Sequence, residues 1–187
     1  MDGPEHHRIA AQTTGDLEGG NASVLALFDG TAIGGFGSVV ATGLGSCSRT
    51  GDHGTAAAGN KGQAHTSFWG VAASGAEGHS VAGTNGVAVA GDRGVAQAGV
   101  SGTAVTRWRG LSMGGEAALC VAGESGAVQG SHTSILAVAY WDAAAARQRL
   151  LVGYVGENGL EADVPYRVVV DDTGPRFERE MSPDVRE

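Results

Sequence analysis

Residues 86–106 read Gly86-Val-Ala-Val-Ala-Gly91-Asp-Arg-Gly94-Val-Ala-Gln-Ala-Gly99-Val-Ser-Gly102-Thr-Ala-Val-Thr, a stretch that repeats every eight residues. The period extends far beyond this segment. Stepping by eight from Ala22 to Ser134 gives fifteen positions, and none of them holds a side chain larger than Ser. A fixed internal period is typical of repeat architectures, in which each unit stacks on its neighbours.

Side-chain size is controlled at several positions of each octad. With Gly86 as position 0, positions 2 and 4 also hold only small or apolar residues, from Val24 and Ala26 to Leu136 and Val138. Side chains alternate along a strand, so positions 0, 2 and 4 are predicted to line the inward face of one short strand. Position 5 is Gly in most octads, which predicts a turn with positive φ at that position.

Two octads then form one 16-residue coil with a strand on each side. Coils stacked about 4.8 Å apart give a rod on the order of 35 Å long for the fifteen octads. The sequence therefore predicts an all-β fold, a two-sided parallel β-solenoid with a thin interior and a small antiparallel C-terminal cap. The alternative, a flexible Gly- and Ala-rich linker, gives no reason to keep side-chain size at fixed positions.

The octad pattern also predicts how the chain is divided. Residues 1–21 are expected to form a partly flexible N-terminal lid, residues 22–138 the solenoid, residues 139–179 a strand-rich cap and residues 180–187 a disordered tail. Within the cap, strands are expected at 135–141, 150–155 and 166–170 and near Phe177.

The two outer faces of the predicted solenoid differ in polarity. One face comprises positions 1 and 3 of the octads that begin at residue 22 and at every sixteenth residue thereafter; it contains no charged residue, and we call it the uncharged face. A flat apolar face of this size is expected to be covered. Either a second copy packs on it, giving a dimer or trimer, or the chain's own C-terminal segment does. The oligomer interface is predicted at Val39, Val71, Val87, Val89, Val105, Leu119 and Val121.

The opposite face is polar and contains the best candidates for metal ligands, His65 and His79 on adjacent coils. Two imidazoles could meet there, but a zinc site needs three or four ligands, and no Cys or carboxylate occupies a matching position. Solvated histidines are the alternative, and no cofactor is predicted.

A different candidate is the turn Arg107-Trp108-Arg109, which lacks the usual Gly at position 5. A Trp flanked by Arg is a frequent anchor in protein interfaces, and cation–π packing is available to it. These three residues are a candidate site for a protein partner. The alternative is a salt-bridged edge that shields a wider turn, and Phe68-Trp69 on the other edge has the same two interpretations.

Composition limits the class of protein. Aromatic residues make up 5% and charged residues 17% of the 187-residue chain, and no run approaches the roughly 20 apolar residues of a membrane span. The start lacks the apolar segment of a secretory signal, so we expect a cytoplasmic protein with no membrane partner. Cys47 and Cys120 are predicted to lie about 20 Å apart, too far for a disulfide.

Motifs of catalysis and phosphate binding are missing. The chain has no G-x-S-x-G, H-E-x-x-H, C-x-x-C or G-x-x-x-x-G-K-[ST] sequence. Residues 22–134 carry six acidic and five basic side chains, too balanced to imitate or bind nucleic acid. We therefore expect a non-enzymatic, self-associating scaffold or protein-binding module. Two rivals stay open: a small-molecule or metal-binding protein that uses the His65/His79 face, and an enzyme whose site forms only at an oligomer seam.

The octads resemble the A-G-x-x-S-x-x-T repeats of bacterial ice-nucleation solenoids at Ala90-Gly91-Asp92 and Ala98-Gly99-Val100. This resemblance implies paired octads in each coil. Ice binding in that family uses outward Thr at positions 1 and 3 together, whereas Thr55 and Thr103 stand without such a partner. We do not expect that activity here.

The whole chain resembles uncharacterised bacterial and phage-encoded proteins in which G-x-x-S-A-A-type octads precede a strand-rich tail. Val155-Gly-Glu-Asn-Gly-Leu160, Pro165-Tyr-Arg-Val168 and Phe177-Glu are similar to the V-G-x-D-G-I, W-Y-x-L and F-V-E segments of that family. The resemblance covers about residues 40–180, with Pro165 in place of the usual Trp. It implies a phage-related origin and this architecture, and it carries no established activity.

Overall fold

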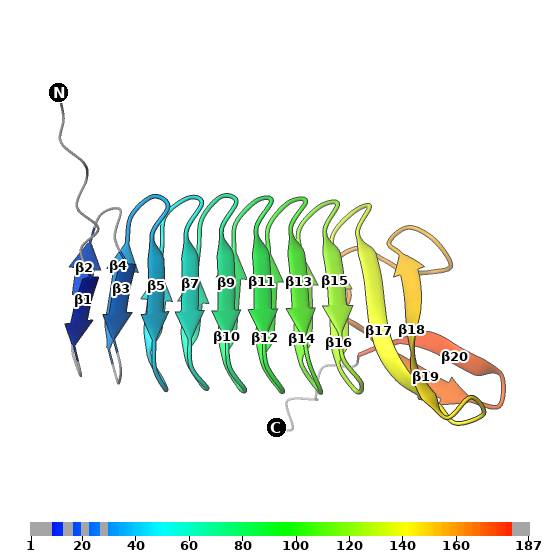
Figure 1. Cartoon of the computed structure of the whole chain (residues 1–187). Coiled ribbons are helices and arrows are strands. Elements are labelled where there is room, and N and C mark those ends of the chain that lie inside the picture. The colour runs from blue at the N-terminus through cyan, green and yellow to red at the C-terminus, as the bar shows by residue number, and fades with distance from the viewer. Residues whose placement is uncertain (1–8, 13–16, 20–22, 27–29, 181–187) are drawn as a thin grey trace, which may run out of the picture.

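The computed structural model describes residues 9–12, 17–19, 23–26 and 30–180. Strands alternate between two sheets along the chain, so that successive coils stack into a straight row (Figure 1). Sheet A has the order β1-β3-β5-β7-β9-β11-β13-β15-β17-β18, and sheet B has the order β2-β4-β6-β8-β10-β12-β14-β16-β19-β20. The predicted all-β, two-sided parallel solenoid with antiparallel C-terminal strands is confirmed.

The strands are short until the C-terminal end is reached. Those of sheet A are β1 (Ile9–Gln12), β3 (Ser23–Ala26), β5 (Val39–Thr42), β7 (Thr55–Ala58), β9 (Val71–Ser74), β11 (Val87–Ala90), β13 (Thr103–Thr106), β15 (Leu119–Ala122), β17 (Ile135–Asp142) and β18 (Arg147–Tyr154). Those of sheet B are β2 (Leu17–Gly19), β4 (Thr31–Gly34), β6 (Cys47–Arg49), β8 (Gln63–His65), β10 (His79–Ala82), β12 (Val95–Ala98), β14 (Leu111–Gly114), β16 (Ala127–Gly130), β19 (Tyr166–Asp171) and β20 (Gly174–Arg179).

The register keeps equivalent residues on top of one another. Thr103 pairs with Val87 on one side and with Leu119 on the other, a step of two octads in each direction. Because the pairing is parallel and in register, each octad position forms a ladder along the rod. Side chains at one position of the sequence therefore share one environment throughout the solenoid.

Solenoid pairing starts before Ala22. β1 pairs with β3 in a register that joins Ile9 to Ser23, and β2 pairs with β4 in a register that joins Leu17 to Ala32. The segment expected to be a lid thus adds a strand to each sheet, with coils slightly shorter than two octads. At the other end the Glu180 amide donates to Pro165 at 2.8 Å, while the expectation for residues 181–187 lies outside the described residues.

The interior is as thin as the octads predict. Position 2 is fully buried from Ala32 to Leu136, and nine Ala side chains form one continuous buried cluster in the middle of the rod. Toward the C-terminal end the interior contains larger side chains, among them Val128, Leu136 and Val138. The predicted inward face is therefore correct, and the core thickens where the cap begins.

Hydroxyl groups cross this interior in every second coil. The hydroxyl oxygens of Ser74 and Ser80 lie 2.7 Å apart, and the Ser80 hydroxyl donates to the carbonyl oxygen of Val89 at 2.6 Å. The same arrangement recurs four octads earlier and four octads later, at Thr42, Ser48 and Ala57 and at Thr106, Ser112 and Val121. Each set connects sheet B to the main chain of sheet A.

The turns differ from the prediction. Positive φ occurs at position 7, where eleven consecutive turns from His53 to Thr133 hold a residue other than Gly at φ near 55 to 60°. The N–H of this residue donates to a main-chain carbonyl oxygen of the next coil. The Arg93 N–H, for example, donates to the Trp108 carbonyl oxygen at 2.8 Å. Glycine at position 5 has another cause. A Cβ on Gly91 would lie 2.7 Å from the amide nitrogen of Ala76 in the coil below, so stacked turns leave no room for it.

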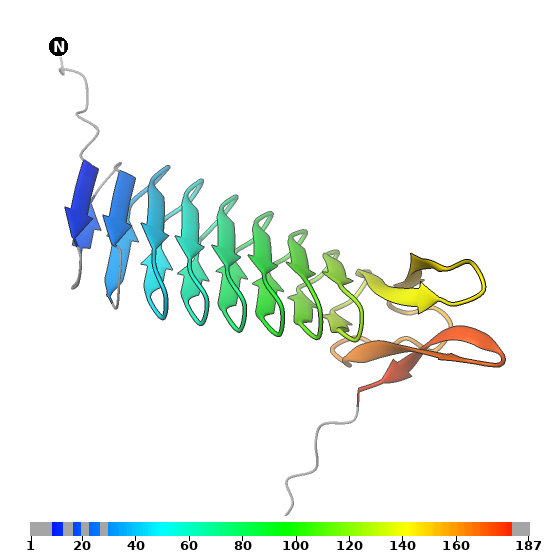
Figure 2. The same cartoon turned by 60° about the horizontal axis from the view of Figure 1, so that its bottom comes forward.

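The cap consists of two antiparallel hairpins, one on each sheet. β17 continues its pairing with β15 and turns into β18, whereas β19 pairs with β16 through Tyr166 and Arg167 before turning into β20. Figure 2 shows the two hairpins extending beyond the last coil as separate layers. Each sheet therefore ends in its own hairpin, and the cap does not close over the end of the rod as a single layer.

Candidate functional site

The uncharged face forms the outer surface of sheet A. Four of the seven predicted interface residues are more than a third exposed: Val39 at 51%, Val71 at 39%, and Val89 and Leu119 at 37% each. Val87, Val105 and Val121 are half-buried by the equivalent residues of the coils above and below. The structure places all seven on one continuous surface of sheet A.

The cap extends this surface, a feature that the sequence analysis did not predict. β18 pairs with β17 so that Tyr154 lies beside Ile135 and Val152 beside Ala137, on the outer side of sheet A. Leu150 is 57% exposed, Trp141 50%, Tyr154 49% and Val152 47%. The alternation of Leu150, Val152 and Tyr154 was the available signal, because residues two apart in a strand share a side.

The C-terminal segment does not cover the uncharged face. The last two strands, β19 and β20, continue sheet B, on the opposite side of the rod. Through Glu180, the chain therefore leaves the outer surface of sheet A open. The face was expected to be covered either by a second copy or by the chain's own C-terminal segment. Within the described residues, the C-terminal segment does not fold back over it.

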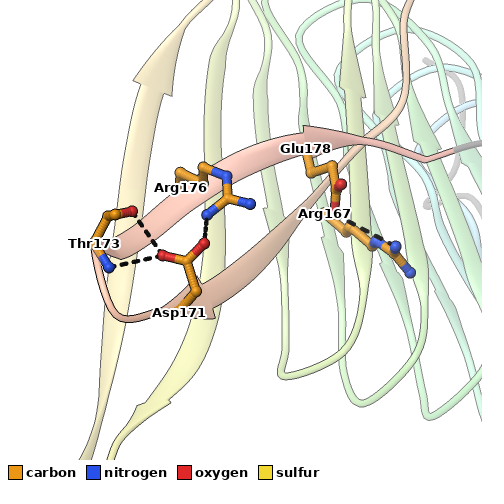
Figure 3. A network of polar contacts seen from close by, with 5 residues as sticks. All are labelled: Arg167, Asp171, Thr173, Arg176 and Glu178. Atoms are coloured by element: carbon orange, nitrogen blue, oxygen red, sulfur yellow. Dashed lines mark hydrogen bonds and ion pairs between the residues drawn. The ribbon is translucent and has the colours of Figure 1, made fainter.

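The outer side of the β19–β20 hairpin is charged, in contrast to that of β17–β18. Asp171 accepts hydrogen bonds from Thr173 and Arg176, which lower the pKa of its carboxyl group to about 2 (Figure 3). Arg167 lies 3.5 Å from Glu178 on the same hairpin. One chain thus builds two hairpins with opposite surface chemistry, and the apolar one continues the uncharged face.

The Arg107-Trp108-Arg109 turn projects from the edge that follows sheet A. The Arg109 guanidinium lies 4.3 Å from the centre of the Trp108 ring, and Arg107 is 3.6 Å from Asp92 in the coil below. Trp108 remains 42% exposed. The predicted stacking between neighbouring turns is present, and the two arginines are engaged within the chain.

A groove of about 410 Å³ begins beside this turn, on the outer side of sheet B. Arg109 lies at one wall and Glu180 at the other, and the floor includes Leu111 and Ala127. The sequence could not predict this groove because it depends on how β19 leaves β16. Its walls carry one charge of each sign.

His65 and His79 are neighbours on sheet B, with ring centres 6.4 Å apart in an edge-to-face arrangement. Burial lowers the pKa of His65, and the nearby Arg49 and His79 lower it further. The Nε2 atom of His65 is buried without a hydrogen-bond partner. Among the described residues no group of three His, Cys, Asp or Glu side chains is placed to hold a metal ion, so the pair lacks the third ligand that zinc needs.

The remaining candidates have local roles. Cys47 is half-buried and Cys120 buried, and both are free thiols. On the edge that follows sheet B, Phe68 and Trp69 pack edge-to-face at 5.8 Å. Trp69 occupies the position with positive φ, so its side chain projects away from the coil.

No family model, curated protein or solved structure matches the chain. Across the part of the chain that the structure describes, no helix is long and apolar enough to cross a membrane.

Proposed function

We propose that this protein is a non-enzymatic scaffold that self-associates through the uncharged face. The observation that carries the proposal is the length of that face: it runs without a charged side chain from Val39 in β5 to Tyr154 in β18, and most of its large side chains are exposed. Burying apolar surface contributes about 25 cal/mol per Å², so a second copy that packs on this face and excludes water stabilises the assembly.

Side-chain size along the face favours two copies in opposite directions. Toward the N-terminal end the outward residues are small, as in Ala41, Ala57 and Ala73, whereas β17 and β18 present Trp141 and Leu150. When two rods pack face to face in opposite directions, each bulky end lies on the thin end of its partner. Rods in the same direction would place bulky residues against each other and leave a gap at the thin ends.

A symmetric dimer satisfies this arrangement. With the two-fold axis between β11 and β13, β5 faces the partner's β18 and β9 faces the partner's β15. The Val87/Val89 strand then lies at the centre, where the face is most regular. An isologous contact of this kind closes on itself, which suits a discrete dimer.

Molar mass by light scattering tests the proposal on the parent chain and on Val89→Asp. An aspartate at the centre of a dry seam carries a charge that has no partner, so the dimer should dissociate to the monomer mass. The matched control is Gln97→Asp, at the same octad position in the next strand along the chain but on the opposite sheet. Gln97 is exposed, so its replacement should leave the dimer intact. A parent chain of monomer mass, or a dimer that persists in Val89→Asp, contradicts the proposed function.

A further inference from the structure

The free edge of β18 presents unpaired main-chain groups. Val155 donates to Ser134 at 3.0 Å, so in this antiparallel pair the residues at 155, 153 and 151 direct their N–H and C=O groups toward β17. The intervening residues Leu150 and Val152 direct theirs outward. β18 is the last strand of sheet A, and no described strand pairs with its outer edge.

The corresponding edge of sheet B is protected. Glu180 donates to Pro165 at 2.8 Å, which by the same alternation directs the main chain of residue 175 outward. That residue is Pro175, which has no N–H to offer, and charged Arg176, Glu178 and Arg179 follow it. Proline and charge are the usual means by which sheet edges avoid pairing with other chains. β18 has neither between Leu150 and Tyr154.

A half-open cavity of about 410 Å³ adjoins the unprotected edge, between the two hairpins. Leu151 and Gly153 of β18 line it, together with Leu160, Tyr166 and Phe177. Gly153 leaves room for its neighbours here, because a Cβ on it would lie 2.5 Å from Leu160 Cδ1 and 2.7 Å from Phe177 Cε2, and one of these side chains would have to shift. A strand added beside β18 would therefore direct every second side chain into this cavity.

We propose that the β18 edge binds an extended segment of a partner protein as an added antiparallel strand, with aliphatic side chains entering the cavity at alternate positions. In this mode of recognition, main-chain hydrogen bonds supply affinity and pockets for alternate side chains supply specificity. The site uses the main-chain edge of β18, whereas the uncharged face uses the outward side chains of the same strand, so strand addition does not depend on self-association.

Charge selects the partner. Arg149 is engaged by Asp142 at 2.7 Å, whereas Arg147, at the start of β18, forms no ion pair with the described residues. The C-terminal end of an antiparallel segment would lie beside Arg147, so the segment should be acidic there. A second copy fits poorly, because pairing two β18 strands would place Arg147 and Arg149 of both copies on the same side of the joined sheet.

The experiment uses the full chain and a fluorescein-labelled peptide, Ser-Thr-Leu-Thr-Val-Thr-Asp-Glu, with binding followed by fluorescence anisotropy. Val152→Pro removes an outward N–H without affecting the bonds to β17, and should weaken binding at least about tenfold. Val152→Thr keeps the N–H and the branched shape, and should bind within about twofold of the parent. Arg147→Glu should weaken binding severalfold, less so at high salt.

Two results would overturn the proposal. One is a parent chain that does not bind the peptide, or binds it no better than a peptide whose central Val is replaced by Pro. The other is a Val89→Asp chain that keeps a dimer mass without peptide and falls to the monomer mass only when Val152→Pro is added, since this would make a second copy the occupant of the edge. The Val89→Asp chain should bind the peptide like the parent, so failure of the face and failure of the edge are measured separately.

Discussion

The hydroxyl of Ser80 donates to the carbonyl oxygen of Val89 at 2.6 Å, from sheet B across the interior to sheet A. Val89 is also the residue whose side chain lies at the centre of the uncharged face. The hydroxyl that crosses the interior therefore helps to hold the strand that presents this face. Its equivalents at Ser48 and Ser112 reach β7 and β15, two other strands of the face.

Removing the Ser80 hydroxyl alone should destabilise the chain at least as much as removing the Ser74 and Ser80 hydroxyls together. Ser80→Ala leaves Ser74 without its acceptor in a part-buried site, and we expect the free energy of unfolding to fall by about 1 kcal/mol. Ser74→Ala combined with Ser80→Ala should cost no more than the single change, because Ala90 and Ala96 show that Ala fits these positions. Denaturant unfolding measures the stability of both variants. If the double variant lost clearly more stability than Ser80→Ala, the two hydroxyls would not act as one hydrogen-bonded pair.

The thin interior should reject a larger side chain. Ala96 is fully buried between Ser80 and Ser112 of the adjacent strands, so Ala96→Leu must force the two sheets apart. We expect a loss of at least about 3 kcal/mol, seen as a lower melting temperature or loss of the strand signal in circular dichroism. Ala96→Ser is the control, since Ser occupies the same position on both sides. A stable Ala96→Leu protein would mean that the inward face is assigned wrongly.

Most of the fold was predictable because one period controls it. Small residues at positions 0, 2 and 4 gave the inward face, the coil length and the two sheets, and the outer faces followed from alternation. The cap hairpins were harder to place. The exposed side of β18 depends on its antiparallel register with β17, and the cavity beside Gly153 depends on where the 155–165 segment returns to the rod. Neither is encoded in the period.

The turns show where composition misleads. Glycine was assigned to positive φ by its usual preference, but at the position-5 glycines the demand comes from stacking, because an added Cβ would meet the turn below. Within residues 30–134, Ser67, Arg107 and Ser131 are the exceptions at this position. Position 7 accepts ordinary residues in the left-handed region because the next coil bonds their N–H groups. The recurrence of the hydroxyls at every fourth octad was visible in the sequence. That they bond across the interior follows only from the distance between the two sheets, which the structure supplies.

Two substitutions in one turn should therefore act in opposite directions. Gly115→Ala places a Cβ 2.9 Å from the Gly99 carbonyl carbon and the Val100 amide nitrogen, and should destabilise the chain by about 1 to 3 kcal/mol. Ala117→Gly relieves a φ of 55° and should change stability by less than about 1 kcal/mol, toward greater stability. Melting temperatures compare them directly. A Gly115→Ala protein as stable as the parent would show that stacking does not exclude a Cβ at position 5.

The Cys120 thiol should link stability to alkaline pH. Burial raises its pKa from 9.0 to about 12, so the folded chain retains the proton more tightly than the unfolded chain. The resulting stabilisation is complete below pH 9 and is lost as the pH rises from 9 toward 12. Unfolding midpoints at pH 8, 10 and 11 should fall more steeply for the parent than for Cys120→Ala. Equal slopes in the two proteins would show that another group controls the alkaline transition.

The direction of the two rods in the dimer can be measured with spin labels on one edge. Leu44 and Trp108 are exposed residues at the same octad position, four coils apart, and each can be replaced by Cys in a Cys47→Ser background. In oppositely directed rods, the two Leu44 labels should lie more than about 30 Å apart, because seven strand spacings of about 4.8 Å separate them. The two Trp108 labels should lie much closer, since they flank the two-fold axis.

Rods that run in the same direction predict a different pattern. Every rung would then face its own equivalent, so the Leu44 and Trp108 pairs would give the same label distance. Electron paramagnetic resonance distance measurements separate these cases without reference to the absolute width of the seam. Equal distances at the two sites would rule out the match between bulky and thin ends while leaving self-association itself intact, and a long Leu44 distance with a short Trp108 distance would fix the axis between β11 and β13.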